Sequence, residues 1–330
     1  MSDLEIPIEY WFAFGGLVAL LLTLDLFVFH RRAHDPTLRE SALWTVFWCS
    51  LALVFNGLVW WQWGTEPAVN FLTGYLVEWS LSMDNVFVFV VIFRYFQTPR
   101  MYQYRVLFWG ILGAVFMRLA FILGSTELLQ HFDWIMPAFG AFLIYTAIKL
   151  TGEEDADVDP ANNFALRLAR KVFWVSSGDF RVHGNRFFVR EAGRLCITPL
   201  FLVLLVIEST DVLFAVDSVP AILGITTERF IVFTSNIFAI LGLRALYFLL
   251  AGVVDLFRFL NYGLAAVLGF VGLKMIAEYA AKEFWHYEER LIHPAASLAV
   301  IVGLLTAAIV ASIALRPKTE EPAAVDAEQE

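Results

Sequence analysis

About nine stretches of apolar residues, each close to the length that crosses a bilayer, constrain this chain more than any other feature. They lie near residues 9–29, 41–61, 70–94, 104–124, 132–150, 197–222, 229–250, 259–277 and 295–315. Helices satisfy their own backbone hydrogen bonds, so they can occupy hydrocarbon. Since 59% of the residues are hydrophobic and only 17% are charged, the sequence predicts an all-α integral membrane protein of about nine transmembrane helices.

Basic residues are concentrated in alternate connections between these stretches. They occur near 31–39, 94–105 and 167–194, and are sparse at 62–69, 125–131 and 223–228. The positive-inside rule therefore predicts that the N-terminus lies outside and that the C-terminus is cytoplasmic. No basic region precedes the first apolar stretch, so we expect no cleaved signal peptide. Asp25 is expected to form a local ion pair with the basic residues 30–32.

Five carboxylates interrupt the apolar stretches. Glu78 and Asp84 lie in EWSLSMDNVFVF, and Glu208, Asp211 and Asp217 lie in ESTDVLFAVDSVP. One carboxylate near the bilayer centre costs about 2.5–3.5 kcal/mol, so five anions facing lipid would cost on the order of 15 kcal/mol. We therefore expect a polar cation site inside the helical bundle.

Helical spacing groups several of these side chains. In the stretch 70–94, Glu78, Ser82 and Asn85 share one stripe, with Asp84 at its edge.

In the stretch 197–222, Glu208 and Asp211 are three residues apart and share one face. Pro220 disfavours helical geometry in the residue before it. A helix break there would turn Asp217 and Ser218 toward the same cavity.

Oxygen ligands without histidine or cysteine suit hard cations such as Mn²⁺, Ca²⁺ and Mg²⁺. The predicted metal ligands are Glu78, Asp84, Asn85, Glu208, Asp211 and Asp217, with Ser82, Ser218, Arg118 and Arg244 as accessory residues. Carboxylates also accept protons, which makes exchange of the cation for protons chemically natural. The alternative is that the acids form structural ion pairs with the two buried arginines, but five acids against two arginines leave a surplus.

The two acidic stretches belong to an internal repeat. Ser82-Met83-Asp84 aligns with Ser209-Thr210-Asp211, and each is followed by an arginine and then a lysine at nearly equal spacing (Arg118 and Lys149; Arg244 and Lys274). A unit of three helices reverses orientation in its second copy, so the sequence predicts two inverted three-helix repeats with a site between them.

The remaining segments complete the domain organisation. We expect two peripheral helices in 1–61, the first repeat in 70–150, a cytoplasmic loop in 151–196, the second repeat in 197–277, a last helix in 295–315 and a disordered acidic tail in 316–330. The loop is predicted to contain a basic amphipathic helix in 164–175 and a β-hairpin around Gly184-Asn185, and it offers a surface for cytosolic partners. The two cysteines predict neither a disulfide framework nor a cysteine metal site.

The motifs EWSLSMDNVFVF, ESTDVLFAVDSVPAIL and HGNRFFVREAGR resemble the TerC family of membrane proteins, especially its Alx-like branch. The resemblance covers roughly residues 10–315. It implies a bacterial inner-membrane protein of seven to nine helices, linked to tellurite resistance, to efflux of manganese and other divalent cations, and to alkaline pH response. It also implies that the six predicted metal ligands line the ion pathway.

The favoured hypothesis is thus an exporter of divalent metal cations, above all Mn²⁺, that works by alternating access. No nucleotide loop, Ser/His/Asp set or zinc motif is present, so we expect a protein that is not an enzyme, has no permanently bound cofactor and binds no nucleic acid. Its expected partners are the transported ion and the lipid bilayer. Two alternatives stay open: a non-transporting scaffold or metal and pH sensor, and an intramembrane aspartyl hydrolase that uses Asp84 and Asp211.

Overall fold

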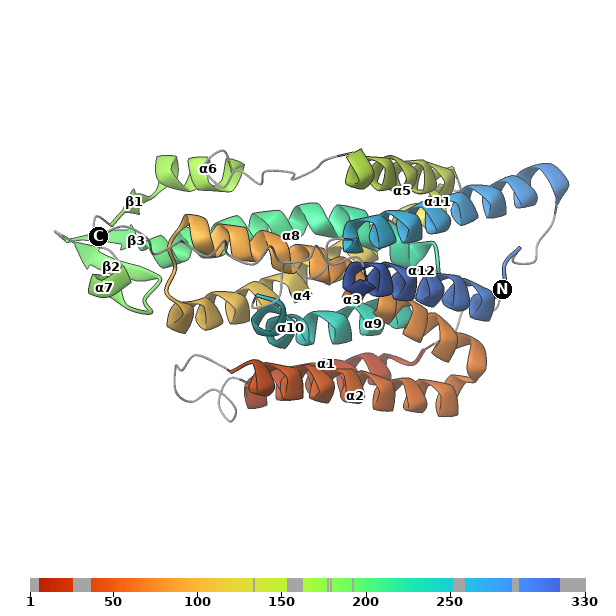
Figure 1. Cartoon of the computed structure of the whole chain (residues 1–330), viewed down its shortest axis with the longest axis horizontal. Helices are drawn as coiled ribbons and strands as arrows, with labels where there is room; N and C mark the ends of the chain where they lie inside the picture. The colour runs from red at the N-terminus through yellow and green to blue at the C-terminus, as the bar shows by residue number, and fades with distance from the viewer. Residues whose placement is uncertain are drawn as a thin grey trace, which may run out of the picture.

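The computed structural model describes residues 6–25, 37–132, 134–152, 163–176, 178, 180–191, 193–251, 259–286 and 291–314, apart from the side chains of Asp84, Gln130 and Arg181. Its long helices run along a common axis, and its three short strands lie at one end of the bundle, called the sheet end below (Figure 1). The predicted acidic tail lies outside the described residues.

The elements of the described part follow the apolar stretches. The helices are α1 (Ile8–Leu24), α2 (Leu38–Trp63), α3 (Thr65–Tyr95), α4 (Arg100–His131), α5 (Ile135–Gly152), α6 (Phe164–Val172), α7 (Phe180–His183), α8 (Pro199–Leu223), α9 (Arg229–Leu241), α10 (Leu243–Leu250), α11 (Leu260–Trp285) and α12 (Pro294–Ala314). The strands are β1 (Trp174–Val175), β2 (Phe188–Glu191) and β3 (Arg194–Ile197).

Six of the described helices are long and apolar enough to cross a membrane, namely α2, α3, α4, α8, α11 and α12. The predicted single helix over 229–250 is wrong, because α9 and α10 meet at Gly242 with a bend of 40°; together they would make a seventh span. The remaining two predicted stretches correspond to α1 and α5, which are shorter at 17 and 18 residues. The class of helical membrane protein is confirmed, whereas nine crossings stay a prediction.

The centre of the bundle consists of α3, α4, α8 and α9, which pack against one another. The helices α1 and α2 lie on one side of this group, and α5 and α11 lie on the opposite side (Figure 1). A sharp corner joins α2 to α3 at Gly64, whose φ of +90° is a conformation that other residues rarely adopt.

The helices α5 and α11 cross closely at two glycines. A Cβ atom on Gly140 would lie 2.7 Å from the carbonyl oxygen of Gly272, and a Cβ atom on Gly272 would lie 2.6 Å from the carbonyl oxygen of Gly140. Because neither residue has a side chain, the two backbones meet directly, as at other close crossings of membrane helices.

The three strands form one small sheet in the order β1-β3-β2, with β1 parallel and β2 antiparallel to β3. The hairpin therefore turns between the paired residues Glu191 and Arg194, where Gly193 has a φ of +78°. The predicted turn at Gly184-Asn185 is wrong: Phe180–His183 form the short helix α7, and Gly184-Asn185 is the turn that ends it.

Candidate cation site

Arg118 on α4 is the centre of a buried polar cluster. Its Nη1 atom forms an ion pair with Glu78 on α3 and donates a hydrogen bond of 2.5 Å to Ser218 on α8. Asn236 on α9 donates a hydrogen bond of 3.0 Å to the other oxygen of Glu78. All four side chains are at most 2% exposed, so one guanidinium joins helices from both halves of the chain in the protein interior.

Several buried polar atoms around this cluster have no hydrogen-bond partner among the described residues. They are Oγ of Ser82, Nε of Arg118 and Oδ1 of Asn236. Buried polar groups in folded proteins nearly always have a partner, either in the protein or in bound water or an ion. The surroundings of Arg118 are therefore chemically suited to hold water or a cation.

Glu208 and Asp211 lie one turn apart on α8 and face α4. The carboxylate of Glu208 contacts the α4 backbone at Gly113. Asp211 is 6% exposed and lines a small cavity with Gly110 and Ala114 of α4. Neither acid forms a hydrogen bond or an ion pair with any described residue, although the charge of Asp211 acts on Glu208, and those of Glu78 and Arg118 act on Asp211.

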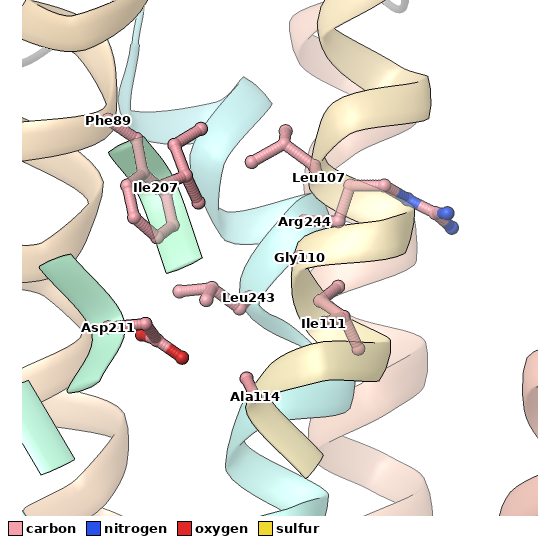
Figure 2. Close-up of a pocket in the computed structure, with 9 residues that line it drawn as sticks. All are labelled: Phe89, Leu107, Gly110, Ile111, Ala114, Ile207, Asp211, Leu243 and Arg244. Carbon is pink, nitrogen blue, oxygen red and sulfur yellow. The ribbon is translucent and has the colours of Figure 1, made fainter. Parts of the chain in front are cut away.

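Figure 2 shows the cavity between α4 and α8. The carboxylate of Asp211 points into it, whereas the guanidinium of Arg244 points away from it. The other walls are apolar and come from Phe89, Leu107, Ile111, Ile207 and Leu243. The space has room for about one water molecule.

The expected helix break at Pro220 is wrong. The helix α8 continues through Pro220 to Leu223, and its last turns are fully buried by packing, which keeps them helical despite the proline. Asp217 consequently stays off the face of Glu208 and Asp211. It accepts a hydrogen bond of 3.2 Å from Thr146 on α5 and interacts with the charge of Lys149.

Arg244 pairs with an acid outside this cluster. It forms an ion pair with Asp25 at the end of α1, and its guanidinium stacks 4.3 Å from the ring centroid of Tyr104. Asp25 is buried against α10 in this pair, and the expected local pair of Asp25 with residues 30–32 stays a prediction. Residues 30–32 themselves lie outside the described residues.

The outcome for the predicted ligands is therefore mixed. Glu78 pairs with Arg118, while Glu208 and Asp211 share the face toward α4, and Asp217 lies apart. Asn85 is buried on α3, and the side chain of Asp84 lies outside the described residues. Within the described part of the chain, no three His, Cys, Asp or Glu side chains are close enough together to hold a metal ion.

Sequence reasoning missed Asn236, Gly113 and Thr146. Asn236 could have been found, since it is an amide inside an apolar stretch, as Asn85 is. Gly113 gave no signal, because a glycine in a membrane helix is common. Its role depends on which residue of another helix lies opposite.

The segment after the undescribed residues 153–162 also reaches this region. Asn163 caps α6 and donates a hydrogen bond of 3.0 Å to Ser209, the neighbour of Glu208. The buried residues Leu166 and Ala169 pack α6 against the core that contains the first half of α8. The helix is thus part of the bundle beside the candidate site.

A second polar cluster lies at the sheet end and has a structural role. Ser176 after β1, His183 in α7 and Glu191 in β2 converge, with the Nε2 atom of His183 lying 2.5 Å from Oγ of Ser176 and 3.2 Å from Oε1 of Glu191. In a catalytic triad the serine and the acid contact different ring nitrogens of the histidine, whereas here both lie near Nε2. This cluster instead connects β1, α7 and β2.

Helices that can cross a bilayer, built around buried carboxylates and arginines, define a multi-pass membrane protein. The chain belongs to the TerC family of integral membrane proteins, whose family model matches residues 63–320. The predicted family resemblance is confirmed.

Close relatives cover nearly the whole chain. An uncharacterized membrane protein of Myxococcus xanthus is 48% identical over 303 residues, which is 92% of this chain and 91% of the relative. A protein of Escherichia coli K12, provisionally named membrane-bound redox modulator Alx, is 43% identical over 304 residues, 89% of this chain and 91% of the relative. The Shigella flexneri protein of the same name is equally similar. No solved structure matches the chain.

Proposed function

We propose that this protein is a transporter that exports divalent metal cations, with Mn²⁺ as the main substrate, by alternating access across a bacterial inner membrane. The observation that carries the proposal is the pair Glu208 and Asp211: two acids one turn apart on α8, neither of which forms an ion pair or a hydrogen bond with a described side chain. The half-buried Glu208 and the buried Asp211 repel each other when both are charged, and both charges are costly in a bilayer. A divalent cation, or protons in its absence, removes both penalties.

The internal repeat supports alternating access. The helices of the two units pack reciprocally, since α3 packs on α9 as α4 packs on α8, and α5 meets α11 at a reciprocal glycine contact. Such reciprocal packing is expected of two inverted units related by a two-fold axis in the membrane plane. Arg118 bridges the two units through Glu78 and Ser218, next to the acids of α8.

The positive-inside rule would put the sheet end in the cytoplasm.

The chemistry of the available ligands favours hard cations. Carboxylate, amide and hydroxyl oxygens from Glu208, Asp211, Asn85 and Ser82 are typical ligands of Mn²⁺, Mg²⁺ and Ca²⁺. The described conformation keeps Glu78 on Arg118, so a loaded site would need the two units to move relative to each other.

Transport in proteoliposomes tests the proposal. With Mn²⁺, Mg²⁺ and Ca²⁺ offered under an imposed pH gradient, Asp211→Asn and Glu208→Gln should each lower the initial rate of Mn²⁺ transport at least about tenfold. Glu127→Gln, at an exposed position on α4, makes the same chemical change away from the site and should transport like the unaltered protein. Unchanged transport by both site variants would refute the proposal.

The name of the enterobacterial relatives suggests a redox role instead. The thiols of this chain are Cys49 on α2, to which Tyr75 donates a hydrogen bond of 3.3 Å, and the buried Cys196 on β3. As a further control, the cysteine-free variant Cys49→Ser/Cys196→Ser should retain Mn²⁺ transport. Loss of transport on removal of these thiols would favour thiol chemistry over the carboxylate site.

A further inference from the structure

Gly113 on α4 lies directly opposite Glu208. A Cβ atom built on Gly113 would overlap Oε1, Oε2 and the carboxyl carbon of Glu208. The whole carboxylate of Glu208 therefore lies over the bare Cα of Gly113. A methyl group at position 113 fits only if the flexible side chain of Glu208 turns its carboxylate away.

The other small residues on this face of α4 do not share this contact. A Cβ atom on Gly110, one turn earlier, would lie 3.4 Å from Cγ2 of Ile207, which is close to ordinary packing. Ala114 already carries a methyl group and lines the cavity. Among these three small residues of α4, position 113 is the one whose side-chain space is taken by a charged group.

Asp211 provides the second indication of a ligand. It is more than nine-tenths buried, has no hydrogen-bond or ion-pair partner among the described side chains, and points into the cavity beside α4 (Figure 2). Glu208 lies one turn away on the same face of α8. The absence of a side chain at Gly113 thus allows the carboxylates of Glu208 and Asp211 to face the same surface of α4.

We propose that Gly113 is a positioning residue for cation binding, because its missing side chain lets the carboxylate of Glu208 lie between α4 and α8 beside Asp211. The inference rests on the proposed function and assigns the divalent cation to a subsite between these two helices. A side chain at position 113 would push the carboxylate of Glu208 out of that subsite while leaving its charge on the protein.

The experiment combines Gly113→Ala with Glu208→Asp, whose carboxylate is one methylene shorter. In reconstituted protein, Gly113→Ala should raise the KM for Mn²⁺ at least about tenfold with a smaller effect on kcat, since the ligand is displaced and not removed. Gly110→Ala, the matched control one turn away, should keep the KM of the unaltered protein. In the Glu208→Asp background, Gly113→Ala should change KM less than about twofold, because the shorter side chain leaves room for the methyl group.

The outcomes separate this inference from the proposed function. If the unaltered protein transports no divalent cation, the proposed function fails. If it transports Mn²⁺ and Gly113→Ala has an unchanged KM, only the present inference fails. Should Gly113→Ala not accumulate in the membrane, the comparison of Glu208→Asp with Gly113→Ala/Glu208→Asp still decides: equal KM values support the inference, and failure of the double variant to accumulate refutes it.

Discussion

The two buried arginines of the described residues occupy corresponding places in the predicted repeat, yet each forms a different kind of contact. Arg118 binds Glu78 and Ser218 from two neighbouring helices, whereas Arg244 binds Asp25 from outside the repeat. The sequence predicted buried acids and arginines, because polar residues in long apolar stretches must face one another. It could not assign the pairs, since each pair joins residues far apart in the chain and depends on how the helices pack.

Glu78→Gln should strongly destabilise the protein. It leaves the buried guanidinium of Arg118 without its carboxylate, and breaking one side of a buried ion pair costs about 3–5 kcal/mol. The measurement is unfolding of the detergent-solubilised protein by heat or denaturant. The double variant Glu78→Leu/Arg118→Met, which removes both charges, should be more stable than Glu78→Gln. An unchanged unfolding midpoint for Glu78→Gln would contradict the importance of this pair.

At the scale of elements, apolar length predicted where helices occur but not where they break. The stretch 229–250 was expected to be one helix and bends at Gly242, while α8 was expected to break at Pro220 and does not. Both differences come from tertiary packing, which a single sequence does not encode locally. The fully buried turns around Pro220 stabilise helical geometry there. A hairpin was expected to turn at the Gly-Asn pair, but the two antiparallel strands β2 and β3 both follow that pair.

The crossing of α5 and α11 should be sensitive to a single methyl group. Gly272→Ala would bring a Cβ atom to 2.6 Å from the backbone of Gly140, so the two helices must separate. Overpacking of this kind costs about 1–3 kcal/mol. Gly269→Ala, one turn away on α11, would meet Cβ of Ala147 at 3.8 Å and should be tolerated. The thermal unfolding midpoints of the two variants test the difference, and equal midpoints would argue against a close backbone crossing.

For the whole molecule, two segments outside the predicted repeat contact residues close to the candidate site. Asp25 at the end of α1 holds Arg244, which borders the cavity of Asp211. Asn163 at the start of α6 binds Ser209, beside Glu208. The sequence interpretation placed the first segment in a pair of peripheral helices and the second in a cytoplasmic loop. In the structure the first pairs with a residue that lines the cavity of Asp211, and the second binds the neighbour of Glu208.

Asp25→Asn should weaken cation binding at a distance. Without the carboxylate of Asp25, the buried guanidinium of Arg244 keeps an uncompensated positive charge in the protein interior, and this charge repels a divalent cation near Asp211 even though it points away from the cavity. We expect the KM for Mn²⁺ to rise several-fold, with Asp25→Glu restoring most of the affinity. Transport kinetics measured over a range of Mn²⁺ concentrations provide the test. A KM for Asp25→Asn that matches the unaltered protein would mean that α1 has no electrostatic influence on the site.

The connection between α8 and α9 has a practical consequence for topology mapping. Gly224, Ile225 and Thr226 are buried, and any side chain at Gly224 would overlap Val271 and Met275 of α11. An epitope tag or a fused reporter enzyme inserted there would disrupt folding before it could report a membrane face. The corner at Gly64, where an added Cβ atom meets nothing within 4 Å, is the better insertion point for locating the same face of the bilayer.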